Sequence, residues 1–406
     1  MKKLGKSILK DSMWSIAGIV LMNAVAQFLI YPLWDRQLGS DAYGNILYLL
    51  SLMNIVAVSL GTALNYARMC NKGSEVKNRS YLLILGGGAV IFGAAAILCR
   101  GLLSLNLGTA GLFALLIGFT MWRFYADVEF RLSLNYKGYF LYYLLISIGY
   151  GAGALLFLKT GEWVLALLFG ELLGVAFVLW KGKVLRPDGL PTKAEFFDVG
   201  GVVAALFGSN LISNLIFNGD RLILKFFIGG TAVTTYYLAS LIGKTAALVT
   251  TPLNSVLIGY LMRYEGGLKK RTVSLLAGGS VAISLIGMLG CFVASIILLP
   301  ILYPAAEYEA AKPFLWLGNL AQIVYFVGNM LNTTLLRFGK KQDQLYVNVL
   351  YGVAFVVLCV PATYLWKLWG FCIAYLVTTL VRLTFALVLL FVRNGKPRQE
   401  EPALDD

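Results

Sequence analysis

Charged side chains inside long apolar stretches are the first residues of this sequence that indicate chemistry. Lys244 lies in the apolar stretch 232–258, eight residues before Pro252, and two acids, Glu171 and Asp127, lie within or at the end of other such stretches. An ionisable group in apolar surroundings is costly and indicates a functional site, although a lysine can also extend to a polar interface. We therefore expect Lys244 to bind an anion in a polar cavity. Either acid would bind H⁺ or Na⁺ as a coupling ion, or would neutralise a nearby cation.

Arginines form a second group of candidate binding residues. Arg36 and Arg221 each directly follow an aspartate at equivalent ends of apolar stretches. The planar guanidinium suits phosphate groups, so both are candidates to meet a pyrophosphate; equally, they could pair with lipid headgroups or acids and fix the loops. Arg123 could pair with Asp127 one helical turn later. The weaker candidates for anion binding are Arg68, Arg123 and Arg382.

Amide side chains recur at helical spacing along several stretches. Asn210, Asn214 and Asn218 follow one another at intervals of four residues and so share one helix face. For a single amide, a hydrogen bond between helices is the more common role. Together, however, the stripes predict a hydrated cavity. Its other expected lining residues are Asn23, Gln27, Asn54, Asn65, Asn319, Gln322 and Asn329.

Several classes of chemistry are excluded by what the sequence lacks. It contains no histidine, which removes His-based catalysis and zinc–histidine sites. Its five cysteines are scattered without a C-x-x-C pair. We therefore expect no catalytic residue, no metal site and no cofactor. A tyrosine-rich cluster near residue 140 could stack on sugars, but an aromatic belt at a membrane interface is the more common role of such residues. The cluster consists of Tyr136, Tyr139, Phe140, Tyr142 and Tyr143.

The elements that position these residues follow from composition. Of the 406 residues 59% are apolar and 13% charged, whereas soluble domains are about 25% charged. Because a membrane-spanning helix needs about 20 mostly apolar residues, the sequence predicts an all-α integral membrane protein with about twelve transmembrane helices. The expected spans are 12–34, 43–65, 80–100, 108–126, 138–158, 162–181, 197–218, 232–258, 272–299, 312–337, 344–364 and 370–393.

The basic residues predict how these helices are oriented. With these spans, 25 of the 34 Lys and Arg residues fall on one side of the membrane and 7 on the other. Because short cytoplasmic loops collect Lys and Arg, both termini are expected in the cytoplasm and the protein in the cytoplasmic (inner) membrane. The net charge of +14 then needs no nucleic-acid partner.

A polar connection divides the predicted helices into two groups of six. It runs from Lys181 to Phe196 and contains two prolines. We therefore expect an N-terminal lobe, residues 1–186, and a C-terminal lobe, residues 187–394, around a central cavity. Residues 395–406 are expected to form a disordered cytoplasmic tail, because they are polar and proline-containing.

One segment resembles a known motif. The segment 31–44, YPLWDRQLGSDAYG, is similar to the "arxLGxxxYG" junction between the first two helices of polysaccharide exporters. Leu60-Gly61 and Arg68 fit the end of that family's second helix, and Asp220-Arg221 through Gly229, Tyr236 and Pro252 look like the matching part of its second half. The family is the Wzx-type flippases, within the multidrug/oligosaccharidyl-lipid/polysaccharide exporter (MOP) superfamily. The resemblance implies two six-helix lobes around a central cationic cavity that opens alternately to either side.

Three functions remain to be weighed. The resemblance implies a monomeric flippase for an undecaprenyl-pyrophosphate-linked oligosaccharide (O-antigen, capsule or exopolysaccharide repeat unit), with membrane lipids, a coupling ion and other polysaccharide assembly proteins as partners. A multidrug or metabolite exporter of the same superfamily is the alternative. A membrane glycosyltransferase or polymerase is disfavoured, because no large extracytoplasmic loop and no D-D-x-x-D cluster is present. The sequence thus favours a transporter over an enzyme.

Overall fold

A computed structural model of the chain describes residues 2–70, 77–263, 270–340 and 342–392. Side chains are described for residues 13–70, 77–246, 270–335, 338–340 and 342–392. Across these ranges the regular structure is entirely helical, with no strand, which confirms the all-α prediction. The predicted tail, residues 395–406, lies outside the described part of the chain.

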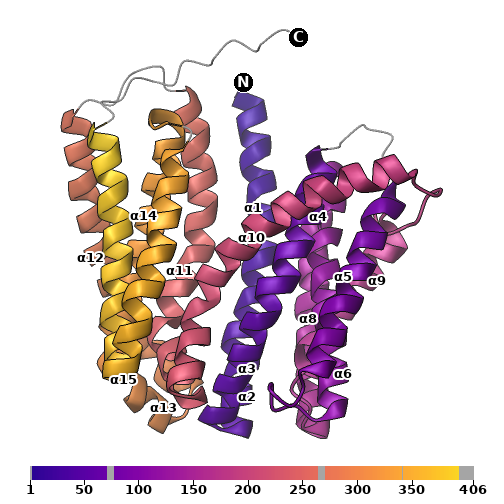
Figure 1. Ribbon diagram of the computed structural model, residues 1–406, viewed down its shortest axis with the longest axis horizontal. Helices are drawn as coiled ribbons and strands as arrows, with labels where there is room; N and C mark the ends of the chain where they lie inside the picture. Colours follow the sequence, from indigo (N-terminus) through magenta and orange to yellow (C-terminus); the bar gives the residue numbers. More distant parts are fainter. Residues whose placement is uncertain (1, 71–76, 264–269, 341, 393–406) are drawn as a thin grey trace. The chain divides into compact units, whose positions relative to one another are not determined.

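The chain forms two compact units. The first comprises Met1–Gly39 and Asn45–Leu222, and the second comprises Ser40–Gly44 and Ile223–Asp406. The helices of the first unit are α1 (Lys2–Val25), η1 (Ala26–Ile30), α2 (Tyr31–Leu38), most of α3 (Ser40–Met53), η2 (Asn54–Val58), α4 (Ser59–Cys70), α5 (Asn78–Leu98), α6 (Leu107–Ala126), α7 (Val128–Leu132), α8 (Tyr136–Thr160), α9 (Leu165–Lys181) and most of α10 (Lys193–Phe227) (Figure 1). Those of the second are α11 (Gly230–Arg263), α12 (Lys270–Leu302), α13 (Ala305–Ala311), η3 (Lys312–Phe314), α14 (Leu315–Phe338) and α15 (Asp343–Val392).

The helices identify a multi-pass membrane protein. Within the described residues, nine helices are long and apolar enough to cross a membrane. The predicted span 162–181 corresponds to α9, which has 17 residues. Two further predicted spans correspond to α15, whose 50 residues are interrupted by non-helical backbone at Trp366 and Lys367. The count of twelve spans stays a prediction.

Glycines allow α8 and α9 of the first unit to pack closely. A β-carbon on Gly149 would lie 2.5 Å from the Cα of Gly170, and one on Gly153 would lie 2.4 Å from the carbonyl oxygen of Leu165. Small residues at a helix contact let backbones approach, which is the usual basis of helix association in a membrane. This contact places Tyr150, which follows Gly149, beside Glu171, which follows Gly170.

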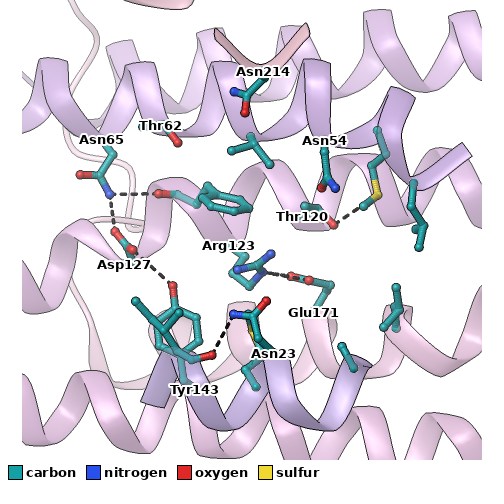
Figure 2. A pocket seen from close by; sticks show the side chains of 18 of the residues that line it. Asn23, Asn54, Thr62, Asn65, Thr120, Arg123, Asp127, Tyr143, Glu171 and Asn214 are labelled. Atoms are coloured by element: carbon teal, nitrogen blue, oxygen red, sulfur yellow. Dashed lines mark hydrogen bonds and ion pairs between the residues drawn. The ribbon is translucent and has the colours of Figure 1, made fainter. Parts of the chain in front are cut away.

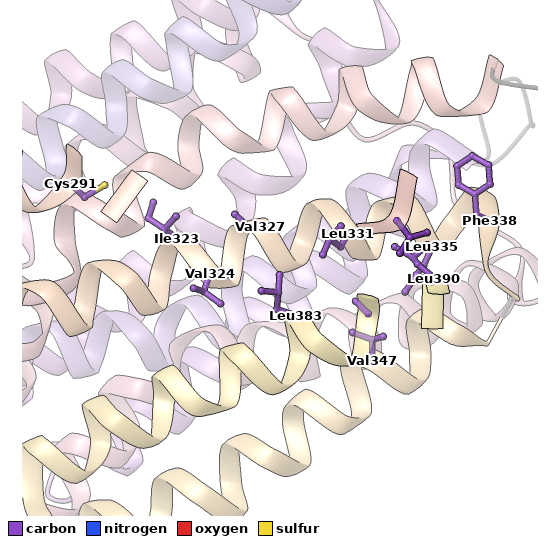
Figure 3. Close-up of a cluster of buried hydrophobic side chains, with 12 residues drawn as sticks. Cys291, Ile323, Val324, Val327, Leu331, Leu335, Phe338, Val347, Leu383 and Leu390 are labelled. Carbon is purple, nitrogen blue, oxygen red and sulfur yellow. The ribbon is translucent and has the colours of Figure 1, made fainter. Parts of the chain in front are cut away.

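The core of the second unit is a stripe of apolar side chains on α14. Val324, Val327, Leu331 and Leu335 recur every three or four residues and therefore share one face, where they pack with buried residues of α12 and α15, such as Leu383 (Figure 3). Since lipid is as apolar as this core, tight packing rather than removal of surface from water is what stabilises it.

The motif segment Ser40–Gly44 is part of the second unit. Gly39 (φ 83°) ends α2, and Gly229 (φ 129°) precedes α11, both with backbone angles that favour glycine. A β-carbon on Gly44 would lie 1.8 Å from the carbonyl oxygen of Gly230, so the two backbones are in direct contact. The hydroxyl of Thr234 donates to the carbonyl of Ser40 at 2.7 Å. The resemblance to the family motif thus falls on a segment where close backbone packing requires glycine.

The connection from Lys181 to Phe196 is held on the first unit by the start of α5. The amide of Asn78 donates to the carbonyl of Lys183, and the carboxylate of Asp188 accepts from the backbone N–H of Arg79. Glu195 accepts from the backbone N–H of Lys77 at 2.6 Å. The compact units accordingly separate between Leu222 and Ile223, while the lobes at residues 1–186 and 187–394 stay a prediction.

Candidate polar cavity of the first unit

A polar cavity of about 440 Å³ lies inside the first unit, lined by residues of α1, η1, α2, α3, η2, α4 and α6–α10 (Figure 2). Its size falls in the range of sites that bind small molecules or parts of larger ones. Five of the amides predicted from the sequence line it, together with three of the predicted charged residues. They are Asn23, Asn54, Asn65, Asn214, Asn218, Arg123, Asp127 and Glu171.

Two π-helical turns contribute to this cavity. Ala26–Ile30 and Asn54–Val58 are the segments η1 and η2, and both ends of the second, Asn54 and Val58, line the cavity. Short π-helical turns are frequent at functional sites because the extra residue re-aims the neighbouring side chains. Asn54 points into the cavity from such a turn (Figure 2).

Arg123 and Glu171 form a buried ion pair at the cavity. Both carboxylate oxygens of Glu171 accept from Nε of Arg123, at 2.9 and 2.7 Å, and the side chains are 8% and 3% exposed. The hydroxyl of Tyr150 donates to the same carboxylate at 2.8 Å. The guanidinium lies 4.3 Å from the ring centre of Phe124. The close contact of α8 with α9 is what brings Tyr150 to Glu171.

Asp127 accepts hydrogen bonds from four side chains at the other end of the cavity. Arg131 donates at 3.1 Å, the hydroxyls of Tyr139 and Tyr143 donate at 3.2 and 3.4 Å, and the amide of Asn65 makes a short contact. The carboxyl group is almost completely buried, whereas the Arg131 side chain is 36% exposed. Four donors can satisfy most of the acceptor capacity of a carboxylate.

The pairing differs from the one predicted by sequence spacing. Arg123 binds Glu171 rather than Asp127, and Asp127 binds Arg131. Asp127 does lie one helical turn after Arg123, since its backbone N–H donates to the carbonyl of Arg123 at 3.2 Å, but the guanidinium of Arg123 is bound by Glu171 of α9 instead. Both carboxylates that line the cavity are therefore bonded to an arginine.

The asparagine stripe of α10 lies beside α4. The amides of Asn210 and Asn214 donate to the carbonyl and the hydroxyl of Ser59, at 3.3 and 2.9 Å, and Asn218 donates to the carbonyl of Asn214. Asn214 and Asn218 line the cavity, whereas Asn210 does not. The stripe therefore combines hydrogen bonding between helices with the lining of a cavity.

Four other predicted residues of the first unit lie outside the cavity lining. Arg68 donates to the side chain of Asn78 at 2.9 Å and lies over the ring of Tyr81. Arg221 donates to the hydroxyl of Ser51 at 3.1 Å. These contacts fit the alternative in which such arginines fix neighbouring segments. The four residues are Gln27, Arg36, Arg68 and Arg221.

Lys244 and the amides of α14 belong to the second unit. Lys244 is half-buried on α11. Asn319 accepts from the backbone N–H of Gly243 at 2.8 Å and donates to the hydroxyl of Ser295, so it joins α11, α12 and α14. Gln322 is fully buried, and its amide has no hydrogen-bond partner within the described residues. Asn329 is half-buried and accepts from Thr333 through its carbonyl.

Arg382 is a buried cation of the second unit. It is 5% exposed and lies between the rings of Tyr325 and Tyr351, at 4.7 and 4.8 Å from the ring centres. Its Nη2 donates to the amide oxygen of Asn348 at 3.2 Å, while Nε and Nη1 have no hydrogen-bond partner in the part of the chain that is described. The ion pairs found among those residues do not include Arg382. The two aromatic rings therefore stabilise this cation alongside the hydrogen bond to Asn348.

Tyr150 and Arg131 line the cavity but were not predicted from the sequence, whereas the tyrosine cluster was assigned either to sugar stacking or to an interfacial belt. Tyr139, Tyr142 and Tyr143 are buried inside the first unit, so the interpretation as an interfacial belt is wrong for these three. Tyr139, Tyr143 and Tyr150 are spaced four and seven residues apart, which places them on one helix face. That regular spacing of hydroxyl groups was the available signal. Nothing in the sequence indicated the two π-helical turns.

Comparisons with known proteins establish the fold. No protein-family model and no curated protein matches the chain. The chain is similar to the solved structure of the lipid II flippase MurJ in an inward closed conformation, with a TM-score of 0.71 and 11% identity over 93% of this chain and 87% of that one. It is also similar to an inward-facing MATE family multidrug resistance transporter of the MOP superfamily, with a TM-score of 0.67 and 13% identity over 93% and 98% of the two chains.

A third similar structure is the MATE transporter VcmN of Vibrio cholerae in its bent form. The TM-score is 0.60, with 15% identity over 97% of each chain. At these identities the likeness concerns the fold alone. The chain therefore has the fold of MOP-superfamily proteins, and these structural neighbours are transporters rather than enzymes.

Proposed function

We propose that this protein is a transporter that flips an undecaprenyl-pyrophosphate-linked oligosaccharide across the cytoplasmic membrane by alternating access through a cationic cavity. The observation that carries the proposal is the charge state of the polar cavity. Both of its carboxylates, Asp127 and Glu171, are bonded to arginines, so neither is left to hold a cationic ligand. Arg382 adds a buried cation without a carboxylate partner among the described residues. An anionic substrate suits this balance.

The proposal includes the finer predictions from the sequence. Twelve helices in two lobes, residues 1–186 and 187–394, would surround the pathway, with both termini in the cytoplasm and the protein acting as a monomer. The cationic residues of the pathway would be Lys244, Arg36, Arg221, Arg68, Arg382 and Arg123. H⁺ or Na⁺ coupling would use Asp127 or Glu171, and the coupling ion would then have to displace the arginine that each carboxylate binds. A large hydrated sugar and a charged pyrophosphate need such a path, whereas the polyprenyl tail can stay in lipid.

A multidrug or metabolite exporter is the second candidate, and the likeness to MATE family structures supports it. The two candidates differ in the charge of the substrate. A cationic drug needs a carboxylate that is accessible in the cavity, while an anionic lipid headgroup needs an accessible cation.

Charge reversal at Lys244 tests the proposed function. We expect Lys244→Ala and Lys244→Glu each to reduce export by at least about tenfold, because a buried anion loses a charge-assisted contact. Transport of a fluorescent polyprenyl-diphosphate oligosaccharide in proteoliposomes, together with complementation of a flippase-deletion strain, measures the effect. The amount of protein in the membrane serves as the control. Full complementation by Lys244→Glu would contradict the cationic pathway.

Arg382→Met is expected to separate stability from transport. Removing a buried charge that has no acidic partner relieves a desolvation cost, although contacts with two rings are lost, so the melting temperature should change by only a few degrees. Transport of the anionic substrate should fall at least about tenfold, a factor that corresponds to one charge-assisted contact. Paired melting and transport assays on the same preparation measure both. Unchanged transport would remove Arg382 from the proposed pathway.

A further inference from the structure

We infer that the terminal nitrogens of Arg123 form a subsite for a phosphate-class anion in the polar cavity of the first unit, and that Glu171 is the residue that positions this guanidinium. The inference rests on the proposed function and gives one of its predicted residues a defined role. It also differs from the prediction that Glu171 carries a coupling ion.

Only one nitrogen of the Arg123 guanidinium is used by its partner. Glu171 contacts Nε alone, through both of its oxygens. No group in the described residues hydrogen-bonds Nη1 or Nη2, and Arg123 lines the cavity. These two nitrogens carry four N–H donors, two of which point side by side from one edge of a planar group, an arrangement that matches two oxygens of a phosphate. The donor edge of Arg123 is therefore available to a ligand.

The guanidinium of Arg123 is held in place by several neighbouring groups. The ring of Phe124 lies against the guanidinium at 4.3 Å, and Tyr150 holds the carboxylate of Glu171 from α8. The hydroxyl of Tyr142 donates to the backbone carbonyl of Arg123 at 3.2 Å. A guanidinium fixed in this way loses little conformational freedom when it binds an anion. Glu171 thus acts through Arg123, as a positioning residue.

Two uncharged polar side chains of the cavity are available for the remaining oxygens of a phosphate. Asn54 and Thr62 line the same cavity, and their side chains have no hydrogen-bond partner within the described residues (Figure 2). Both can donate to phosphate oxygens. Glu171 neutralises part of the charge of Arg123, so the affinity of this subsite for an anion stays moderate. A moderate affinity suits a transporter, because a transporter must also release its ligand. The chemical class that fits is a phosphate or diphosphate, as an inorganic ion or as the headgroup of a lipid.

The test measures anion binding directly, using the full chain purified in detergent and in nanodiscs. Inorganic diphosphate and a short-chain polyprenyl diphosphate are titrated separately by calorimetry, with melting temperatures recorded for every variant. We expect Glu171→Gln to bind both probes about tenfold more tightly than the unaltered protein, because the amide oxygen still accepts from Nε while the competing negative charge is gone. A role limited to structure would not raise the affinity.

Two variants complete the design. Arg123→Gln combined with Glu171→Gln removes both charges together, leaves no unpaired buried ion and should still fold, yet it should bind neither probe. Asp127→Asn removes a carboxylate of the same cavity that contacts Arg131 instead, and it should raise the affinity much less than Glu171→Gln. Arg123-dependent binding of inorganic diphosphate assigns the subsite to the phosphate group itself. Arg123-dependent binding of the polyprenyl probe alone assigns it to a lipid headgroup. Both results support the inference.

Two results would overturn the inference. One is equal binding by the unaltered protein and by the double variant. The other is loss of binding in Glu171→Gln at an unchanged melting temperature, which would make Glu171 a coupling carboxylate. Lipid flipping measured in parallel separates the two proposals. Arg123-dependent binding without flipping contradicts only the proposed function, while flipping without such binding contradicts only the subsite.

Discussion

Gly44→Ala is expected to prevent stable accumulation of the protein in the membrane. The added methyl group would lie 1.8 Å from the carbonyl oxygen and 2.4 Å from the carbonyl carbon of Gly230. Both atoms belong to backbone, so no side-chain rotation can relieve the clash. We expect a loss of more than about 3 kcal/mol, because overpacking a core typically costs about 1–3 kcal/mol and these backbone atoms cannot move aside. Membrane quantity and the monodisperse fraction after detergent extraction measure the effect.

Gly111→Ala is the matched control for this prediction. Gly111 lies in α6, and a β-carbon there would meet no heavy atom within 4 Å. Alanine favours a helix over glycine by about 1 kcal/mol, so this variant should accumulate as well as the unaltered protein or better. Normal accumulation of Gly44→Ala would show that the contact between Ser40–Gly44 and the start of α11 does not determine the stability of the second unit.

Asp127→Ala is expected to have the second large effect, on the stability of the first unit. The substitution removes the acceptor of four donors at once and leaves the charge of Arg131, together with the buried hydroxyls of Tyr139 and Tyr143, without that partner. Removing one partner of a buried, hydrogen-bonded charge costs about 3–5 kcal/mol. Thermal unfolding of the purified protein, followed by tryptophan fluorescence, measures the loss.

Asp127→Asn separates the loss of charge from the loss of the acceptor. An amide oxygen can still accept from one of the tyrosines or from Arg131, so this variant should lose less than half as much stability as Asp127→Ala. If both variants melted at the temperature of the unaltered protein, the four hydrogen bonds would contribute nothing measurable to stability, and the cavity would not depend on Asp127 for its shape.

The class of the fold could be predicted from the sequence, because hydropathy acts over whole segments. Runs of about 20 apolar residues admit only a helix in a membrane. The positions of the amides along helices also follow from helical spacing, and Asn23, Asn54, Asn65, Asn214 and Asn218 do lie at one cavity. The unit boundary could not be read in this way. The polar connection looks like a separator in composition, but Asn78 and Lys77 bond it to the first unit.

The partner of Arg123 could not be predicted from the sequence, although the pair of Asp127 with Arg131 lies at helical spacing. The partner of Arg123 is 48 residues away, on a helix whose approach depends on glycine contacts between α8 and α9. Sequence spacing reports only neighbours within one helix, so it suggested Asp127. The tyrosines whose hydroxyls surround Asp127 can be read from the sequence. Aromatic residues near a predicted membrane interface do not, however, show which side of the helix is buried.

The π-helical turn Ala26–Ile30 has a consequence for the register of the first transmembrane segment. One extra residue is accommodated there, and a residue in an α-helix turns by about 100°. Everything before the turn is therefore rotated relative to everything after it. Asn23 and Tyr31 can both face the same cavity only because of this rotation. Deleting a single residue within Ala26–Ile30 would leave Asn23 seven residues before the present Tyr31 in an uninterrupted α-helix, within about 20° of the same direction, so Asn23 and Met22 should stay at the cavity.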